Sequence, residues 1–398
     1  MKTKLMTLLL LAVGIGSVSA STTIGTISYD LDAAKQTATV VGGVTTNGTI
    51  NIPETVTYNE IEYAVTAIGW DAFYNNTNLT SIIIPNSIVK IGDGAFDGCK
   101  NLVSLTIGNN VIDIGLSAFS GCTSLTSLTI PNRVTRIGSH AFSGCRGLTS
   151  VTIPNSVSYI ADNAFDECTS LPVIDNIRYA DTYLVTVVDK TLNSYTIRQG
   201  TMWIAGNAFS GCKNIAAIVI PEGVKAIGDL AFQNCTALTS VNFPHSVTML
   251  GSRIFTGCTS LNTPVYNNTC FAYMPSSFTG DYTIPDGMKL ISGYAFSNCN
   301  GISSITIPKS LDSIGTYAFK GCTNITSVIW NAQKCAVTTP ESPFHDSQSK
   351  ITSFILGEDV EVIPTFLCLG MTALTSISIP NKTKEIGYGA FELCHCIF

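Results

Sequence analysis

Residues 148–170 read Leu-Thr-Ser-Val-Thr-Ile-Pro-Asn-Ser-Val-Ser-Tyr-Ile-Ala-Asp-Asn-Ala-Phe-Asp-Glu-Cys-Thr-Ser, one copy of a 23-residue unit that recurs along most of the chain. Its Ala-Phe pair has counterparts at Ala72-Phe73, Ala95-Phe96, Ala118-Phe119, Ala141-Phe142, Ala208-Phe209, Ala231-Phe232, Ile254-Phe255, Ala295-Phe296, Ala318-Phe319 and Ala390-Phe391, with imperfect copies at Phe344 and Phe366. A fixed period of about 20–50 residues is typical of a stacked array. The sequence therefore predicts a β-rich solenoid.

Each copy of the unit begins with a short strand. Residues 150–153 alternate between polar and β-branched apolar side chains, a pattern that indicates a half-buried strand. Pro154 ends this strand because proline cannot donate a ladder hydrogen bond. Val157 and Ile160 predict a second short extended piece on the opposite wall. The Ala-Phe-x-x-Cys segment predicts a single helical or 3₁₀ turn whose Phe and Cys point inward.

Three stretches depart from the 23-residue period. Residues 21–66 lack the signature and alternate between short apolar runs and Gly or Asn turns, which predicts an N-terminal cap of β-hairpins over the first coil. The array is expected to fill residues 67–398. Within it, residues 173–203 and 262–291 predict two irregular, hairpin-bearing coils. The turn of the first hairpin is expected at residues 189–193.

The N-terminus has the features of a secretory signal. Lys2 and Lys4 precede an apolar stretch, residues 5–15, and Val18-Ser19-Ala20 offers small residues for cleavage after Ala20. A retained membrane anchor is the alternative. The apolar core is shorter than the roughly 20 residues a membrane-spanning helix needs, and no later stretch approaches that length.

Composition excludes some classes of partner. The chain has 398 residues, of which 12% are charged, and its formal net charge is −6. With 21 Lys and Arg and no basic run, the sequence does not predict nucleic-acid binding through phosphates. The same absence of a polybasic segment argues against a charged membrane surface as the target.

The fourteen cysteines fall into two groups. Ten of them follow a repeat Phe by three residues, and this shared phase predicts a ladder of small, buried, reduced thiols, although occasional pairing between adjacent coils stays open. These are Cys99, Cys122, Cys145, Cys168, Cys212, Cys235, Cys258, Cys299, Cys322 and Cys394. The four off-phase residues, Cys270, Cys335, Cys368 and Cys396, are the better candidates for disulfides in an exported chain.

The repeat, Leu-x-x-Ile/Val-x-Ile-Pro-x-x-Val-x-x-Ile-Gly-x-x-Ala-Phe-x-x-Cys, resembles the BspA-like leucine-rich repeats, also called the Treponema pallidum type, over residues 67–396. The resemblance implies a right-handed superhelix of leucine-rich-repeat coils on an exported or surface-exposed protein. It also implies adhesion, either to host matrix proteins such as fibronectin or fibrinogen or between microbes. The family has no shared catalytic motif. Residues 171–175, 331–344 and 366–368 depart from the pattern, so distorted coils are expected there.

Nothing in the sequence predicts catalysis, a metal or a cofactor. The four histidines include His140 and His245 at variable repeat positions, and Cys394-His395-Cys396 has no second ligand pair at zinc-finger spacing. No nucleophile-elbow, metalloprotease or phosphate-loop motif occurs. We therefore expect a non-enzyme with no cofactor.

The outward positions of the first strands are the candidate partner-binding residues. They predict a flat, hydroxyl-rich, nearly uncharged wall, which is either a simple solvated sheet face or a binding surface. The wall residues are Thr106, Thr129, Thr152, Asn242, Thr306 and Ser378. Aromatic anchors beside the wall are expected in the two insertions, at Tyr179, Tyr183, Tyr266 and Tyr273.

These features predict a secreted or cell-surface, non-catalytic binding protein, with a protein or glycan as partner, on host extracellular matrix or another cell surface. The alternative is a passive spacer, or a truncated remnant of a longer surface protein, since the chain stops at Phe398 shortly after a repeat signature.

Overall fold

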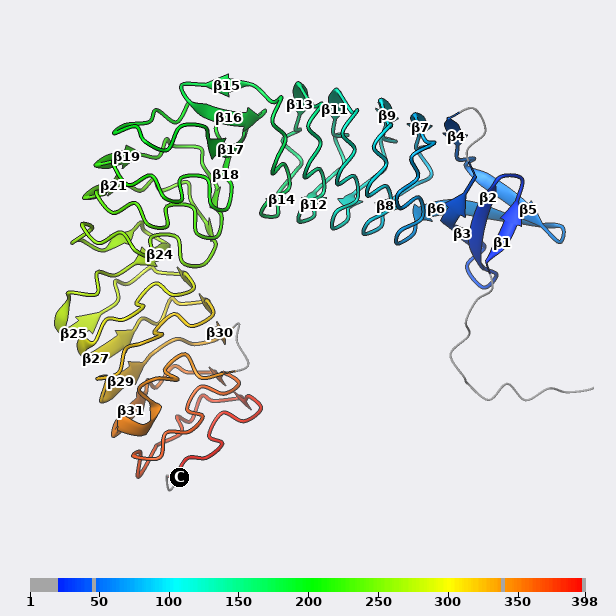
Figure 1. The fold of residues 1–398 in the computed structure, drawn as a ribbon. Coiled ribbons are helices and arrows are strands. Elements are labelled where there is room, and N and C mark those ends of the chain that lie inside the picture. The colour runs from blue at the N-terminus through cyan, green and yellow to red at the C-terminus, as the bar shows by residue number, and fades with distance from the viewer. Residues whose placement is uncertain (1–20, 45–47, 338–340, 396–398) are drawn as a thin grey trace, which may run out of the picture.

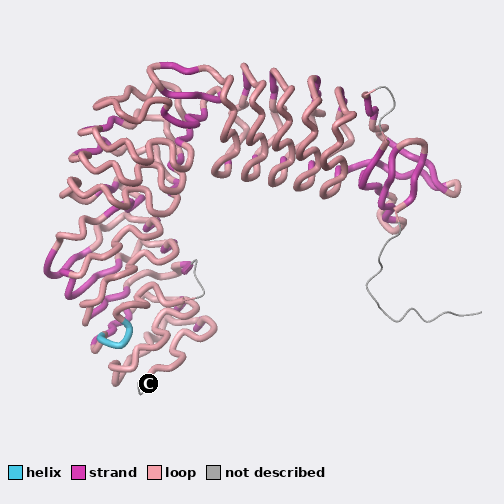
Figure 2. Tube along the Cα trace, in the orientation of Figure 1, coloured by secondary structure: helices cyan, strands magenta, loops and turns pink. Residues whose placement is uncertain are grey.

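The computed structural model describes residues 21–44, 48–337 and 341–395 of the chain. The expected signal peptide, residues 1–20 with its cleavage point after Ala20, lies outside these residues. Figure 1 shows a curved array of coils that begins after the N-terminal strands and ends near the C-terminus. The array bends near residues 173–187. Figure 2 shows that strands occupy a small part of each coil and that turns and loops form the rest. The predicted β-solenoid is confirmed.

The first strand of each coil lies on the outer, convex side of the arc (Figure 1). Neighbouring strands pair in parallel at a step of one repeat, as Ser127 does with Ser150 and Thr129 with Thr152. The strands of this outer row are β4 (Thr49–Asn51), β7 (Ser81–Ile83), β9 (Ser104–Thr106), β11 (Ser127–Thr129), β13 (Ser150–Thr152), β19 (Ala217–Val219), β21 (Ser240–Asn242), β25 (Thr279–Thr283), β27 (Gly301–Ile307), β29 (Ser327–Trp330) and β31 (Ser353–Leu356).

The second strand of each coil lies on the inner, concave side, as Figure 1 shows for β8, β12, β14, β18 and β30. These strands have two residues each, and they also pair in parallel from coil to coil. The inner row contains β8 (Lys90–Ile91), β10 (Asp113–Ile114), β12 (Arg136–Ile137), β14 (Tyr159–Ile160), β18 (Trp203–Ile204), β20 (Ala226–Ile227), β22 (Met249–Leu250), β26 (Leu290–Ile291), β28 (Ser313–Ile314), β30 (Ala336–Val337), β32 (Val362–Ile363) and β33 (Glu385–Ile386).

The N-terminal segment is an antiparallel β structure joined to the inner row. Strands β1 (Thr22–Ile24), β2 (Ile27–Asp32) and β3 (Thr37–Gly43) form a meander, and β5 (Thr55–Tyr58) and β6 (Ile61–Ile68) form a hairpin. Strand β6 pairs in parallel with β3 and with β8. The inner edge of the first coil is therefore hydrogen-bonded to the hairpin segment rather than open, as the fold prediction expected.

Both insertions contain the predicted hairpins, but the turn of the first is elsewhere. Strands β15 (Val173–Ile174), β16 (Ile177–Ala180) and β17 (Tyr183–Val187) pair antiparallel, so the chain turns at Asp175-Asn176 and at Asp181-Thr182. The expected turn at residues 189–193 is wrong as the hairpin turn. Asp181 has a positive φ of 51°, a conformation that Asp tolerates in tight turns. The second hairpin joins β23 (Val265–Tyr266) to β24 (Cys270–Tyr273).

The repeat phenylalanines stack one above another through the core. Phe119 lies between Phe96 and Phe142, with ring centroids 5.0 and 5.4 Å away and planes within 6° of parallel. Similar stacks join Phe209 to Phe232 and Phe296 to Phe319. Since each ring packs on the coils before and after it, no coil buries its apolar residues alone.

The in-phase cysteines also form a buried row. The thiol of Cys145 donates to the carbonyl oxygen of Phe119 at 3.2 Å, and that of Cys168 donates to the carbonyl of Phe142 at 3.1 Å. The same contact recurs from Cys99, Cys122, Cys235, Cys258 and Cys322. Cys270 and Cys335 are buried free thiols, so the disulfide prediction for these two is wrong. For Cys368 and Cys396 it stays a prediction, because Cys396 lies outside the described residues.

One irregular coil keeps the geometry with other residues. Cys394 donates its thiol to the carbonyl of Cys368 at 2.8 Å, the contact that elsewhere joins a repeat Cys to a repeat Phe. Cys368 therefore takes the core position of the phenylalanine, and it is fully buried. Phe366, which the sequence suggested for that role, has a positive φ of 57° and packs edge-on against Tyr388 instead.

The expected helical turns are looser than predicted. In each coil, isolated bonds span three residues, as from the Cys99 N–H to the Phe96 carbonyl, without continuing into a helix. Among the described residues the regular helix is a single 3₁₀ turn, η1 (Gln348–Lys350). Helical hydrogen bonds are not needed in this segment, because its remaining N–H groups donate to carbonyls of the next coil, as the Phe96 N–H does to the carbonyl of Ala118.

The inner row of strands is interrupted at the insertions. One sheet runs from the cap to β14, the next from β15 to β22, and a third from β23 to β30. The apolar core divides near the second interruption, into a cluster ending at Ala272 and another from Phe271 to Ala390. The two irregular coils therefore mark the places where the regular stacking changes.

Candidate functional site

The outer row of strands carries the predicted wall of hydroxyl groups. Thr106, Thr129, Thr152, Asn242 and Ser378 are exposed, and Thr306 is half-buried. Parallel pairing places Thr129 and Thr152 directly beside one another, so their side chains project from the same face. These residues are thus available to a partner, and their role as a binding surface stays a prediction.

The wall also has apolar side chains at the same register. Ile83 pairs with Thr106, Val219 with Asn242, and Ile355 follows Thr306 two coils later. Ile83 and Ile355 are each 53% exposed, and Val219 is 65% exposed. The outer surface therefore combines hydroxyl groups with exposed aliphatic side chains, whose contact with water is unfavourable.

Two of the four expected aromatic anchors lie in the core. Tyr179 and Tyr183 are each 2% exposed, because β16 and β17 fold back over the solenoid interior. They are therefore not exposed anchors beside the wall, and whether they contact a partner stays a prediction. Tyr266 is 42% exposed, and Tyr273 is half-buried beside Phe255. Of the tyrosine set, Tyr266 alone presents a large exposed surface.

The inner face contains a hollow at the first interruption of the sheet. Its volume is 240 Å³, and inner strands on both sides of the first insertion contribute to it. It is lined by Tyr159, Ile160, Asp162, Tyr183, Trp203, Ile204, Ala226, Ile227, Gly228, Asp229, Met249, Leu250 and Gly251. Within the described residues β14 has no paired strand on its insertion side, which leaves room for the hollow.

Asp162 ties the coils together around this hollow. Its Oδ1 accepts the Gly206 N–H and its Oδ2 accepts the Asp229 N–H, both at 3.1 Å. Glycine is required at position 228, because a Cβ there would lie 2.2 Å from the Asp162 carboxylate. Burial raises the pKa of Asp162, and the nearby charge of Asp229 raises it further.

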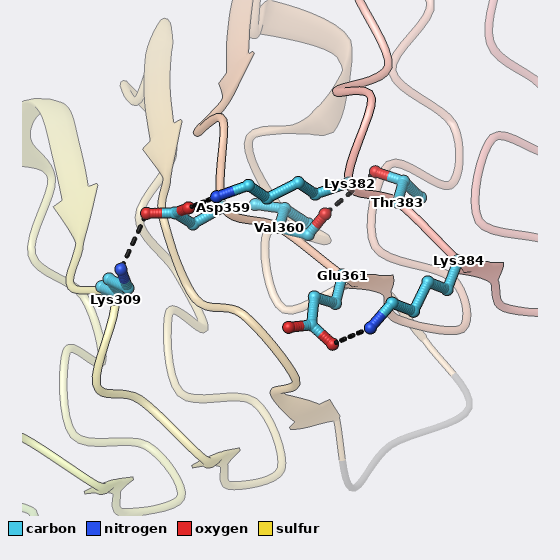
Figure 3. A network of polar contacts seen from close by, with 7 residues as sticks. All are labelled: Lys309, Asp359, Val360, Glu361, Lys382, Thr383 and Lys384. Carbon is cyan, nitrogen blue, oxygen red and sulfur yellow. Dashed lines mark hydrogen bonds and ion pairs between the residues drawn. The ribbon is translucent and has the colours of Figure 1, made fainter.

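A cluster of ion pairs lies in the C-terminal coils. In Figure 3, Asp359 lies between Lys309 and Lys382, at 2.7 and 2.5 Å. Glu361 is likewise held by Lys384, as Figure 3 shows, and by Lys334. The two lysines beside Asp359 lower its pKa to about 2. Each carboxylate is therefore paired with two lysines, so the cluster joins neighbouring coils and has an excess of positive charge.

The described part of the chain contains no cluster of side chains suited to a metal ion. There, no three His, Cys, Asp or Glu side chains are grouped so that they could hold a metal ion. His395 is exposed beside the half-buried Cys394, and Cys396 lies outside the described residues. Among the helices described, none has the length and apolar character to cross a membrane.

Sequence reasoning missed the hollow and its residues. Tyr159 and Asp162 fall at positions that vary between repeats, and Trp203 lies inside an irregular insertion. The signal that was available is the change of phase itself, since 44 residues separate Phe165 from Phe209 where two regular repeats would need 46. A break in phase predicts a break in stacking, although not which residues surround it.

A family model described as "BspA type Leucine rich repeat region" matches residues 49–175, 188–280 and 265–397, in six copies. A search of curated proteins finds no match.

Several solved structures are similar. A leucine-rich repeat protein from Bacteroides ovatus is 26% identical, with 94% of this chain and 92% of that chain covered and a TM-score of 0.43. A leucine rich cell surface protein from Faecalibacterium prausnitzii is 27% identical, with 80% and 97% covered and a TM-score of 0.35. The T. pallidum leucine rich repeat protein is 23% identical, with 61% and 91% covered and a TM-score of 0.36.

Proposed function

The chain belongs to the BspA-type leucine-rich repeat family, and from this premise we propose that it is a secreted or cell-surface adhesion protein that binds a protein or glycan partner without catalysis. Leucine-rich repeat arrays serve as interaction modules because stacked coils offer a long, continuous surface.

The observation that carries the proposal is the outer row of strands. Exposed Thr106, Thr129 and Thr152 recur at the same register as the exposed aliphatic side chains of Ile83 and Val219. Hydroxyl groups supply hydrogen bonds to a partner, while the aliphatic groups gain free energy when a partner removes them from water. A surface with few charges gains its affinity from contact area and repetition more than from electrostatic attraction.

Export is supported by the sequence of the first 20 residues, whose charged start, apolar stretch and small residues before the proposed cleavage after Ala20 suit a signal peptide. A non-catalytic role is supported by the use of the buried polar groups. The thiols bond to backbone carbonyls and Asp162 bonds to backbone N–H groups, so these side chains hold coils together. We propose host extracellular matrix or another cell surface as the location of the partner.

Binding of the full chain to immobilised matrix proteins and to a glycan array tests the proposal. A variant with Thr129→Lys and Thr152→Lys places two charges in the middle of the wall and is expected to weaken binding about tenfold. Thr372→Lys is the matched control, because Thr372 is an exposed turn residue in a C-terminal coil, far along the array from Thr129 and Thr152. If no ligand is bound in either screen, or if the wall variant binds as well as the control, the proposal fails and a spacer role is favoured.

A further inference from the structure

The hollow on the inner face lies where a column of alternating charges stops. Along the inner strands, Lys90, Asp113 and Arg136 occupy equivalent positions one repeat apart, and Asp113 contacts both cations, at 3.9 and 3.0 Å. The next equivalent residue is Tyr159, which is neutral and 47% exposed. The hollow begins at this residue.

The hollow is lined by two carboxylates and by no positively charged side chain. Asp162 and Asp229 line it, and its lining includes no Lys, Arg or His. Backbone N–H groups bond to both oxygens of Asp162, and the Ser252 N–H bonds to Oδ1 of Asp229 at 2.5 Å. These contacts satisfy hydrogen bonds but do not neutralise the charges. The carboxylates of the C-terminal coils differ, because lysines pair with Asp359 and Glu361.

Aromatic side chains surround the same space. Tyr159 lies at the exposed rim of the hollow, while the buried rings of Tyr183 and Trp203 line its interior. The faces of such rings attract cations, most strongly where water is excluded. Met249 and Leu250 provide apolar surface that suits the methylene groups of a long side chain. A volume of 240 Å³ is below the range of about 300–1,000 Å³ that drug-sized ligands occupy, so the hollow fits a single side chain.

We propose that this hollow receives a lysine or arginine side chain of the partner protein. This inference rests on the proposed binding function and deepens it. It adds a second contact with the partner, on the inner face, and says that the side chain entering the hollow is positively charged. The ammonium or guanidinium group pairs with Asp162 and Asp229, and its stem packs on Tyr159 and Met249. Because a cation favours the ionised carboxylate, its arrival also lowers the raised pKa of Asp162.

The test uses small probes and the full chain, so it does not depend on knowing the partner. The chain is labelled with ¹³C in its tyrosine rings, and the Tyr159 signal is identified from the Tyr159→Phe variant. Nα-acetyl-lysine amide and Nα-acetyl-arginine amide, whose side chains keep their positive charge, are expected to shift the Tyr159 signal saturably. N-acetyl-norleucine amide, which has a neutral side chain of similar shape, and a methyl glycoside are expected to leave it unchanged.

Two carboxylate variants give the matched comparison. Asp229→Asn keeps the shape of an exposed side chain and should weaken binding of the lysine probe about threefold. Asp93→Asn is the control, because Asp93 likewise accepts a backbone N–H from the next coil, that of Leu116 at 2.8 Å, outside the hollow. The proposal is overturned if the norleucine amide or the glycoside shifts the signal as the cations do, if no probe shifts it, or if Asp229→Asn binds like wild type.

The two proposals fail in different experiments. Suppose that the chain captures a partner and that the wall variant binds this partner more weakly. If the Tyr159 signal then does not respond to the cationic probes, only the hollow proposal is overturned. Saturable binding of the lysine probe by a chain that captures neither a protein nor a glycan would overturn the proposed function and leave a cation site in the hollow.

Discussion

The sulfur atoms show how one residue position can serve every coil. A thiol is small enough for the core, and its S–H group satisfies a carbonyl that lies 26 residues earlier, as Cys145 does for Phe119. Burial raises the pKa of the Cys99 thiol to about 12, and burial also raises the pKa of Cys168. Since the thiolate is the reactive form, these groups are chemically protected while the chain is folded.

We therefore expect the native ladder thiols to resist Ellman's reagent and to react together on unfolding. Cys394 should react first among the described cysteines, because it is the one that is not fully buried. The measurement is the rate of thiol labelling with and without denaturant, followed by mass spectrometry of the labelled peptides. Fast native labelling of Cys122 or Cys145 would contradict the buried geometry.

Two carboxyl groups should give pH effects of opposite sign. The lysines beside Asp359 lower its pKa from 3.8 to about 2, so its ion pairs stabilise the fold above about pH 4 and are lost as the pH falls toward 2. The pKa of Asp162 is raised, so the folded chain binds the proton more tightly, and stability falls as the pH rises through the window above 3.8.

Urea unfolding of wild type, Asp359→Asn and Asp162→Asn across pH 2–6 measures both effects. The difference between wild type and Asp359→Asn should shrink with acid. The stability of wild type relative to Asp162→Asn should instead increase as the pH falls. The altered hydrogen bonds add a loss that does not depend on pH. Parallel pH profiles for all three proteins would show that neither shift is coupled to folding.

At the scale of the strand and turn, one side chain fixes the second hairpin. Asn267, 5% exposed, donates to the carbonyls of Pro244 and Val247 at 2.8 and 2.9 Å. Its Oδ1 accepts the N–H groups of Thr269 and Cys270 at 2.9 and 2.7 Å. The hairpin between β23 and β24 is thus held to the preceding coil and closed by the same amide.

Asn267→Ala should destabilise the fold by about 2–4 kcal/mol, because it leaves several buried polar groups without partners. The adjacent Asn268 is exposed and provides the control, since Asn268→Ala should have an effect within about 0.5 kcal/mol. Urea unfolding, combined with hydrogen exchange of residues 262–275, measures the cost and its location. Equal stability of the two variants would show that the amide is dispensable.

The same insertions show what the sequence could and could not predict. The repeat phase identified the strands, the inward-facing phenylalanines and the cysteine row, because each position meets the same surroundings in every coil. In the insertions that repetition is lost. Alternating aromatic residues are compatible with either face, so Tyr179 and Tyr183 were assigned to solvent although they are core residues. The hollow depends on contacts such as Asp162 to Asp229, 67 residues apart, which no local pattern encodes.

For the whole molecule, the division of the core predicts how the array unfolds. One apolar cluster contains residues up to Ala272, and the other runs from Phe271 to Ala390. The inner sheet is also interrupted between β22 and β23. In a solenoid each coil depends on its neighbours, so a weak junction lets one block unfold while the other stays folded.

Matched phenylalanine variants test this division. Phe119 stacks between two rings in the first cluster, and Phe319 stacks between Phe296 and Phe344 in the second, at 4.7 and 5.0 Å. Each substitution by Ala should cost about 3–5 kcal/mol. Hydrogen exchange in rising urea should show that Phe319→Ala exposes residues 280–390 early while residues 80–160 stay protected, and that Phe119→Ala does the reverse. If either variant lowers protection equally along the chain, the array unfolds as one unit and the junction transmits stability as well as a regular coil does.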